Sequence, residues 1–202
     1  MESPLVPTRT ALVNVHWQQD IVTETGALAP FFHASVAKRG VLDKARRLVG
    51  WARDAGILVV WARVAFRPGY PEILPNCALN RLVLDLGALL DGSPGARIVD
   101  ELTPLPDEPV VTHHGISAFG RTAIDGILRA RGVDTVLVSG VATNISVEGT
   151  ARDAMNLGYR AVLVEDACAA ATDEAHDATL ATFALLGEVT TLDELASAAV
   201  AR

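Results

Sequence analysis

The sequence predicts an α/β fold in which helices cover both faces of a parallel sheet. Short runs rich in β-branched residues alternate with longer stretches of helical periodicity along the whole chain. Each of the helical stretches also closes on a glycine, the residue best suited to the left-handed position after a helix. Repeated β-α-β units of this spacing pack as a parallel sheet between two helix layers. With 202 residues, we predict a single domain spanning 1–202.

Six runs are predicted to form the strands of this sheet. They are continuously apolar, as expected for strands buried on both faces, rather than alternating between apolar and polar residues. In chain order they cover 10–16, 57–64, 109–112, 134–139, 160–165 and, with the weakest pattern, 188–191.

Four helical stretches lie between the predicted strands, over 35–56, 121–132, 145–158 and 173–187. Their closing glycines are expected to adopt positive φ angles, and they are Gly56, Gly132, Gly158 and Gly187. Thr172 precedes Asp173 and Glu174, so it is a good N-cap with acidic residues in the first helical turn.

One long segment, 65–95, fits neither pattern and contains several prolines and glycines. An irregular segment of this length inside a compact domain is usually a functional loop or lid. We therefore expect it to border the site, with part of it helical.

Composition and charge exclude several classes of partner. The net charge is −7, and the acidic and basic residues are scattered, whereas nucleic acids and anionic membranes require a concentrated basic face. The apolar runs are too short to cross a bilayer, and the opening MESPLVPTRT lacks the features of a signal peptide. Cys77 and Cys168 lie far apart and match no ligand motif, so we predict a cytoplasmic protein with free thiols.

Polar side chains follow three of the predicted strands. His16 ends the first strand, His113 and His114 end the third, and the GVATNIS turn after the fourth leads into a helix through Ser146. Ligands of open parallel sheets bind beyond the carboxyl ends of the strands, so these side chains are expected to share one cleft. Backbone N–H groups in the first turn of the helix favour negative charge, which suits an oxyanion site near Ser146.

These same segments resemble those of a known enzyme superfamily. The strings TALVNVHWQQD, GARIVDEL, VVTHHGISAFGRT, GVATNISVEGTARDAMNLGY and VLVEDACAA, over about 10–170, are similar to the isochorismatase-like cysteine hydrolases. That superfamily includes nicotinamidases, carbamoylsarcosine amidases and isochorismatases. The resemblance implies a Rossmann-like three-layer α/β/α domain with a six-stranded parallel sheet in the order 3-2-1-4-5-6. It also implies a small-molecule substrate and a homodimer or homotetramer.

The sequence departs from the superfamily at all three positions of its catalytic triad. Most members carry Asp at the position of His16, Lys at that of His113 and the nucleophilic Cys at that of Ser146. The family's nicotinamidases also hold a metal through Asp and His residues after the second strand, and ARVAFRPGY contains neither. We therefore predict no metal and no other cofactor. A metal held by His16, His113 and His114 is the weakest alternative, since no carboxylate accompanies them.

Three functions remain open for this altered triad. A serine hydroxyl needs a general base, and histidine is the best suited, so His16 or His113 would activate Ser146 for attack on an amide or carbamoyl compound. Alternatively, protonated His16 would act as a general acid on an enol ether. The third possibility is a catalytically silent protein that binds a small molecule or serves as a scaffold. No carboxylate has an obvious claim to orient either histidine, and Asp20 is only a candidate. Because neighbouring histidines disfavour each other's protonation, either activity should change steeply at mildly acidic pH.

The pocket wall is predicted from the residues that follow the strand ends. Gln18 is expected to orient a substrate amide or carboxylate, and Arg67 to pair with a carboxylate. As the resemblance implies, the backbone N–H groups of Ala142 and Ser146 would form the oxyanion hole. The remaining predicted contacts to substrate are Trp17, Phe66, Phe119 and Val141. His33 and His176, on predicted helices, are assigned no role.

Overall fold

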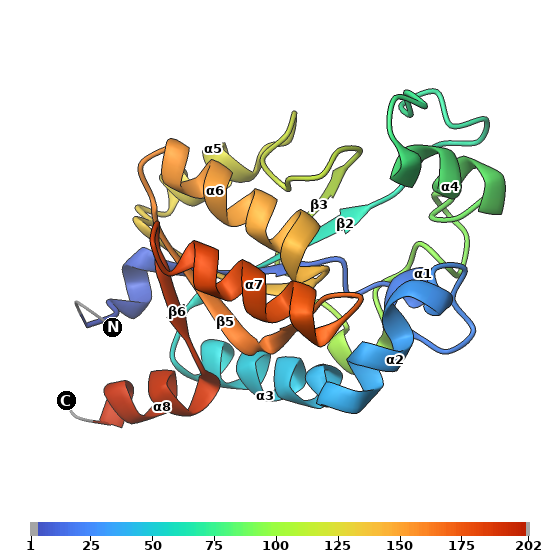
Figure 1. Ribbon diagram of the computed structural model, residues 1–202. Helices are drawn as coiled ribbons and strands as arrows, with labels where there is room; N and C mark the ends of the chain where they lie inside the picture. The colour runs from blue at the N-terminus through green and yellow to red at the C-terminus, as the bar shows by residue number, and fades with distance from the viewer. Residues whose placement is uncertain (1–3, 201–202) are drawn as a thin grey trace.

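A six-stranded parallel sheet forms the centre of the molecule (Figure 1). The computed structural model describes residues 4–200, and the strand order is β3-β2-β1-β4-β5-β6, which confirms the predicted fold class and order. The strands are β1 (Thr10–Val15), β2 (Leu58–Val64), β3 (Val110–His113), β4 (Thr135–Val141), β5 (Arg160–Ala169) and β6 (Glu188–Thr190).

Helices cover both faces of this sheet. The α-helices are α1 (Gln19–Val22), α2 (Ala29–Arg39), α3 (Val41–Asp54), α4 (Ala78–Leu86), α5 (Ile124–Ala130), α6 (Glu148–Asn156), α7 (Asp173–Phe183) and α8 (Leu192–Val200). Residues of α5, α6 and α7 pack on one face, and residues of α2, α3 and α8 pack on the other. No helix among residues 4–200 is long and apolar enough to cross a membrane.

The central strand β1 shows why the predicted strands are continuously apolar. Its residues alternate between the two cores: Leu12 belongs to one cluster, and Ala11, Val13 and Val15 belong to the other. All six residues of β1 and all seven of β4 are buried. Each fully buried Val or Leu side chain contributes about 1.5–3 kcal/mol through its removal from water.

The prediction of one helix over 35–56 was wrong, because Gly40 divides this region into α2 and α3. Gly40 has a φ of 60° and is both the C-cap of α2 and the residue before α3. Helical periodicity on both sides of Gly40 hid the break, since a left-handed residue changes the direction of the chain without interrupting the apolar pattern. Helix α8 was not predicted at all.

The other predicted helix ends were confirmed with one exception. Gly56, Gly132 and Gly158 have positive φ angles, and Thr172 Oγ1 accepts a hydrogen bond from the Ala175 N–H (3.2 Å) at the start of α7. Gly187 does not have a positive φ angle; instead, a Cβ atom there would lie 2.7 Å from the Phe183 ring. Gly187 is therefore needed for close packing rather than for a left-handed turn.

Helix α4 lies in the segment predicted to be an irregular loop or lid. Figure 1 shows α4 beyond the carboxyl end of β2, away from both helix layers. Cys77, its N-cap, is exposed, whereas Cys168 on β5 is buried, and both thiols are free.

Candidate functional site

The two strand-end histidines meet beyond the carboxyl edge of the sheet. His16 follows β1 and His113 ends β3, on the two sides of β2. Their Nε2 atoms are 2.8 Å apart, and their ring planes are inclined by only 14°. The ring centroids are 4.8 Å apart, so the rings meet at their nitrogen edges. The predicted convergence of these two side chains is what the structure shows.

The backbone of His16 turns this side chain out of the strand. Its φ is 62°, in the left-handed region that non-glycine residues seldom adopt, and its N–H still donates to the Ala62 carbonyl of β2 (2.9 Å). The last ladder bond of β1 is therefore kept while the chain changes direction at the site. Backbone strain of this kind is concentrated at functional sites.

The hydrogen-bond partners assign the protons of the pair. His113 Nδ1 lies 3.1 Å from the Gly115 carbonyl oxygen, which can only accept, so this nitrogen carries a proton. In a neutral ring, His113 Nε2 is then the acceptor, and His16 Nε2 donates to it. In this tautomer Nδ1 of His16 is unprotonated while the ring is neutral, so it is the basic position of the pair, and the backbone hydrogen bond with Val141 favours the ring once it has taken up a second proton.

Both histidines are held in the neutral form. Burial lowers the pKa of His16 well below its ordinary value, and proximity to His113 lowers it further, whereas a backbone hydrogen bond with Val141 opposes the shift. Burial also lowers the pKa of His113 to about 4. At neutral pH the pair therefore presents a base and carries no charge.

Both His16 and Ser146 line a cavity of about 580 Å³. Phe66, Val141 and Ala142 also line it, and His113 contacts His16 from outside the lining. Six of the predicted site residues are therefore gathered at this cavity. The rest of the lining is mostly aliphatic and comes from α1, α2, α4 and the turn after β4: Ile21, Leu28, Phe32, Leu79, Val83, Leu89 and Ile145 among others.

Ser146 reaches the cavity through a π-helical turn, Thr143–Val147 (η3), between β4 and α6. The Val147 N–H donates to the Ala142 carbonyl (3.2 Å), five residues back, and the Val141–Ala142 peptide bond is cis. The strand that precedes the turn approaches β1 very closely. A Cβ atom on Gly140 would lie 2.0 Å from the Val15 carbonyl oxygen, so only glycine allows this contact. This contact places the Ser146 turn beside the residue that leads into His16.

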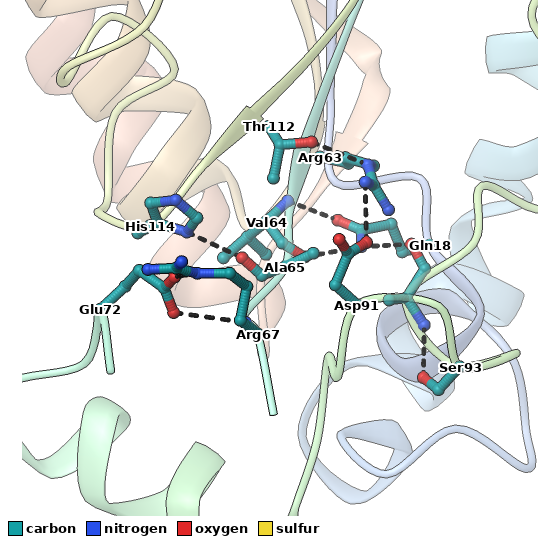
Figure 2. A network of polar contacts seen from close by, with 11 residues as sticks. Gln18, Arg63, Val64, Ala65, Arg67, Glu72, Asp91, Ser93, Thr112 and His114 are labelled. Carbon is teal, nitrogen blue, oxygen red and sulfur yellow. Dashed lines mark hydrogen bonds and ion pairs between the residues drawn. The ribbon is translucent and has the colours of Figure 1, made fainter. Parts of the chain in front are cut away.

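Two of the predicted substrate contacts are structural residues. Gln18 is fully buried, and its side-chain amide donates to the Val64 and Ala96 carbonyls and accepts from the Val64 N–H, each bond spanning 2.8–2.9 Å (Figure 2). Its hydrogen bonds therefore join the end of β2 to the loop before β3. Trp17 is 1% exposed and belongs to the hydrophobic core. Neither residue lines the cavity.

Arg67 and Phe119 also lie away from the cavity. The Arg67 side chain is exposed and forms an ion pair with Glu72, as Figure 2 shows. Phe119 packs against the Tyr159 ring on the α5–α6 side of the sheet, with centroids 6.0 Å apart. Both residues were predicted to contact substrate because they follow a strand. The prediction fails because a residue's place in the chain does not fix the direction in which its side chain points.

Two polar residues have roles that differ from those expected. The Asp20 carboxylate accepts from the N–H groups of Ala27 (3.2 Å) and Leu89 (2.7 Å), so it holds loops rather than a histidine. His114 lines the cavity, and its Nδ1 lies 2.8 Å from the Ala65 carbonyl oxygen. Among residues 4–200, no group of three or more His, Cys, Asp or Glu side chains is arranged to hold a metal ion.

His176, to which the sequence assigned no role, is fully buried and connects a surface ion pair to the Ser146 turn. Arg39 Nη2 donates to His176 Nε2 (2.8 Å), so His176 Nδ1 carries the proton and donates to Thr143 Oγ1 (2.8 Å). Arg39 in turn pairs with Asp173 (3.3 Å). No local pattern could have revealed this chain, because its members lie on α2, η3 and α7.

Comparison with known proteins agrees with this architecture. Residues 10–194 match the isochorismatase domain family. The ureidoacrylate amidohydrolase RutB of Enterobacter sp. (strain 638) is 34% identical over 173 residues, which cover 80% of this chain and 75% of that protein. An isochorismatase family protein from Desulfovibrio vulgaris subsp. vulgaris str. Hildenborough matches with a TM-score of 0.85 and 31% identity over 96% of this chain and 99% of that one. The N-carbamoylsarcosine amidase of Thermoplasma acidophilum matches with a TM-score of 0.72 and 30% identity, over 91% and 96% of the two chains. The chain therefore belongs to the isochorismatase domain family.

Proposed function

We propose that this protein is a serine-type hydrolase of a small amide or carbamoyl compound. Ser146 is the nucleophile, His16 is the general base, and His113 positions His16. The observation that carries the proposal is the 2.8 Å contact between His16 and His113 at a cavity that Ser146 also lines. The names of two relatives, an amidohydrolase and an amidase, support amide hydrolysis.

His113 supplies the hydrogen-bond acceptor that orients His16, a role for which the sequence offers no obvious carboxylate. In serine hydrolases the base is held in the correct tautomer by an acceptor on its other nitrogen, usually a carboxylate. Here the acceptor is the bare Nε2 of His113, which is fixed because Nδ1 donates to the Gly115 carbonyl. His113 is neutral, so it orients His16 but stabilises the imidazolium less than a carboxylate does.

The proposed reaction has two steps, acylation of Ser146 and its deacylation. Ser146 Oγ attacks the substrate carbonyl carbon while its proton passes to Nδ1 of His16, and the same proton then moves to the departing nitrogen as the amide bond breaks. Water releases the acyl group from Ser146 with His16 again as base. The N–H groups of Ala142 and Ser146 would stabilise the oxyanion, as the resemblance implies.

The general-acid reaction on an enol ether is less well supported. It requires a protonated His16 at working pH, and both burial and the neighbouring His113 oppose protonation of that ring. The same burial favours a base, because a neutral imidazole is what accepts a serine proton.

The proposal is tested by covalent labelling together with turnover. We expect a fluorophosphonate to add to Ser146 and to be located there by mass spectrometry. The label should be absent in Ser146→Ala and retained in Ser93→Ala, whose hydroxyl lies outside the cavity. Turnover of an amide and ester panel should fall by about 10²–10⁴-fold in His16→Ala. Ligand binding without labelling or turnover would instead identify a catalytically silent binding protein.

A second variant tests the nucleophile by changing its chemistry. Ser146→Cys, made in a Cys77→Ala background because Cys77 also lines the cavity, should hydrolyse the same substrates and become sensitive to iodoacetamide. Cys77→Ala alone should stay active and insensitive. Equal activity of Ser146→Ala and the natural protein would contradict the proposal.

A further inference from the structure

The cavity wall carries no Lys or Arg side chain among the residues that the structure describes. Its ionisable lining residues are His16, His114 and Cys77, and aliphatic and aromatic side chains form most of the remainder. A buried carboxylate needs a cation or several donors to replace its hydration, and without them its burial is strongly unfavourable.

The arginines nearest in sequence to this wall are already engaged elsewhere. Arg67 pairs with Glu72, and Arg63 pairs with Asp91 (2.8 Å) while its Nε donates to Thr112 Oγ1 (2.9 Å), as Figure 2 shows. Arg81, in the first turn of α4, donates to the Pro75 carbonyl (3.0 Å). None of the three lines the cavity.

The amide group of Asn80, at the α4 end of the cavity, is also paired within its own segment. Asn80 Nδ2 donates to the Leu74 carbonyl (2.8 Å) and to Asn76 Oδ1 (3.2 Å). These donors are therefore occupied before any ligand enters. By contrast, Leu79 and Val83 on α4 face Phe66 and Leu89 around one space that suits a hydrocarbon group.

We propose that the site takes an uncharged amide or carbamoyl compound with an apolar substituent, and that it excludes substrates bearing a carboxylate. This assignment rests on the proposed function for the bond that is cleaved, and it adds the chemistry of the rest of the substrate. It separates this chain from the relative that acts on ureidoacrylate, a compound with a carboxylate.

Binding to the Ser146→Ala variant tests the substrate class without any turnover. The probes are 3-phenylpropionamide and its 4-carboxyphenyl counterpart, measured by calorimetry at pH 7.5. We expect the neutral amide to bind about tenfold or more tightly than the carboxylate, a difference of at least ~1.4 kcal/mol. A preference for the carboxylate, equal binding of both, or failure of the neutral amide to bind overturns the inference.

A charge placed on the wall should reverse this preference. Leu79→Arg in the Ser146→Ala background should bind the carboxylate more tightly than the amide. Leu86→Arg, on the exposed side of the same helix, should keep the original order. Failure of the proposed function gives a different result. If the natural protein binds the neutral amide but is neither labelled nor active, the proposed catalysis is wrong and the proposed ligand class still holds.

Discussion

At the scale of residues, two histidines meet at their Nε2 atoms where the family resemblance implies an acid and a base. The Gly115 carbonyl fixes the tautomer of His113, His113 in turn fixes that of His16, and burial keeps both rings neutral. An arrangement of this kind needs no carboxylate to hold its geometry. In the proposed mechanism its weakness is electrostatic, because the neutral His113 stabilises the charge that forms on His16 during attack less than a carboxylate would.

The lowered pKa values predict the pH profile of the reaction. A general base is active when it is unprotonated, so kcat/KM should be level from pH 8 to below pH 6 and should fall in more acidic solution. Below the pKa of the base, kcat/KM should fall by about tenfold per pH unit, since each unit lowers the unprotonated fraction of the base tenfold. Because burial lowers the pKa of His16 well below its ordinary value, the structure moves the expected transition to a lower pH than the mildly acidic range predicted from the sequence.

A stopped assay with short exposure to acid measures this profile without loss of folded protein. A rate that rises as the pH falls from 7 to 5 would contradict the base role, because it would indicate a protonated His16 acting as the acid.

His176 is predicted to stabilise the fold through its two hydrogen bonds. His176→Leu removes the acceptor of the half-buried Arg39 side chain, and it leaves the fully buried Thr143 hydroxyl without its donor. We expect the free energy of unfolding to fall by about 1–3 kcal/mol. Urea denaturation measures it, and the double variant with Arg39→Leu should lose less than the sum of the single losses. Strict additivity would show that the chain from Arg39 to Thr143 is not a coupled unit.

At the scale of elements, the site depends on how closely β4 approaches β1. Gly140 has a φ of 137°, and the position of its absent Cβ is occupied by the Val15 carbonyl. Gly140→Ala should force the ends of these strands apart, displacing His16 relative to Ser146. We expect a loss of more than about 1 kcal/mol of stability together with most of the activity.

Gly50→Ala is the matched control for this change. Gly50 lies inside α3, with nothing within 4 Å of an added Cβ. Alanine there should stabilise the helix by about 0.5–1 kcal/mol and leave turnover unchanged. Thermal unfolding and initial rates compare the two variants, and an active, stable Gly140→Ala protein would show that the strand contact does not position the site.

The elements also show which parts of the site could be predicted from sequence. The placement of His16, His113 and Ser146 in one region could be predicted because the carboxyl ends of parallel strands share one edge, so a residue's place in the strand pattern gives its place in space. Gln18 and Arg67 were misplaced, because nearby backbone groups and Glu72 decide where their long side chains point. The α4 part of the wall was expected as a loop or lid that is partly helical, but its individual lining residues were not, since tertiary packing rather than local pattern determines which of them face the cavity.

At the scale of the whole molecule, three buried histidines make the fold sensitive to acid. Burial lowers the pKa values of His113 and His176 to about 4, and it lowers the pKa of His16 well below its ordinary value. The unfolded chain, in which histidine has its ordinary value of about 6.5, therefore binds more protons between about pH 6.5 and 4. Stability is fully present above this range and is lost as the pH falls through it.

Other titrating groups act in a different range or in the opposite direction. Arg53 helps to lower the pKa of Glu108, and Lys38 and Arg39 lower that of Asp173. The stability that these two carboxylates contribute is therefore lost only as the pH falls below their ordinary pKa values, near pH 4. Burial and the neighbouring Asp166 raise the pKa of Glu165, which opposes the histidine effect. The decline that begins near pH 6.5 therefore belongs to the histidines.

Urea denaturation at intervals from pH 8 to pH 4.5 tests this assignment. The free energy of unfolding should be level above about pH 7 and then decrease, each histidine contributing up to about 1.4 kcal/mol per pH unit. His176→Gln should start from a lower stability at pH 8 but show a shallower decrease, because one buried imidazole no longer has to remain neutral. An unchanged slope in His176→Gln, or a natural protein whose stability stays level down to pH 4.5, would show that burial does not hold these rings neutral. The same result would remove the reason for treating His16 as a base.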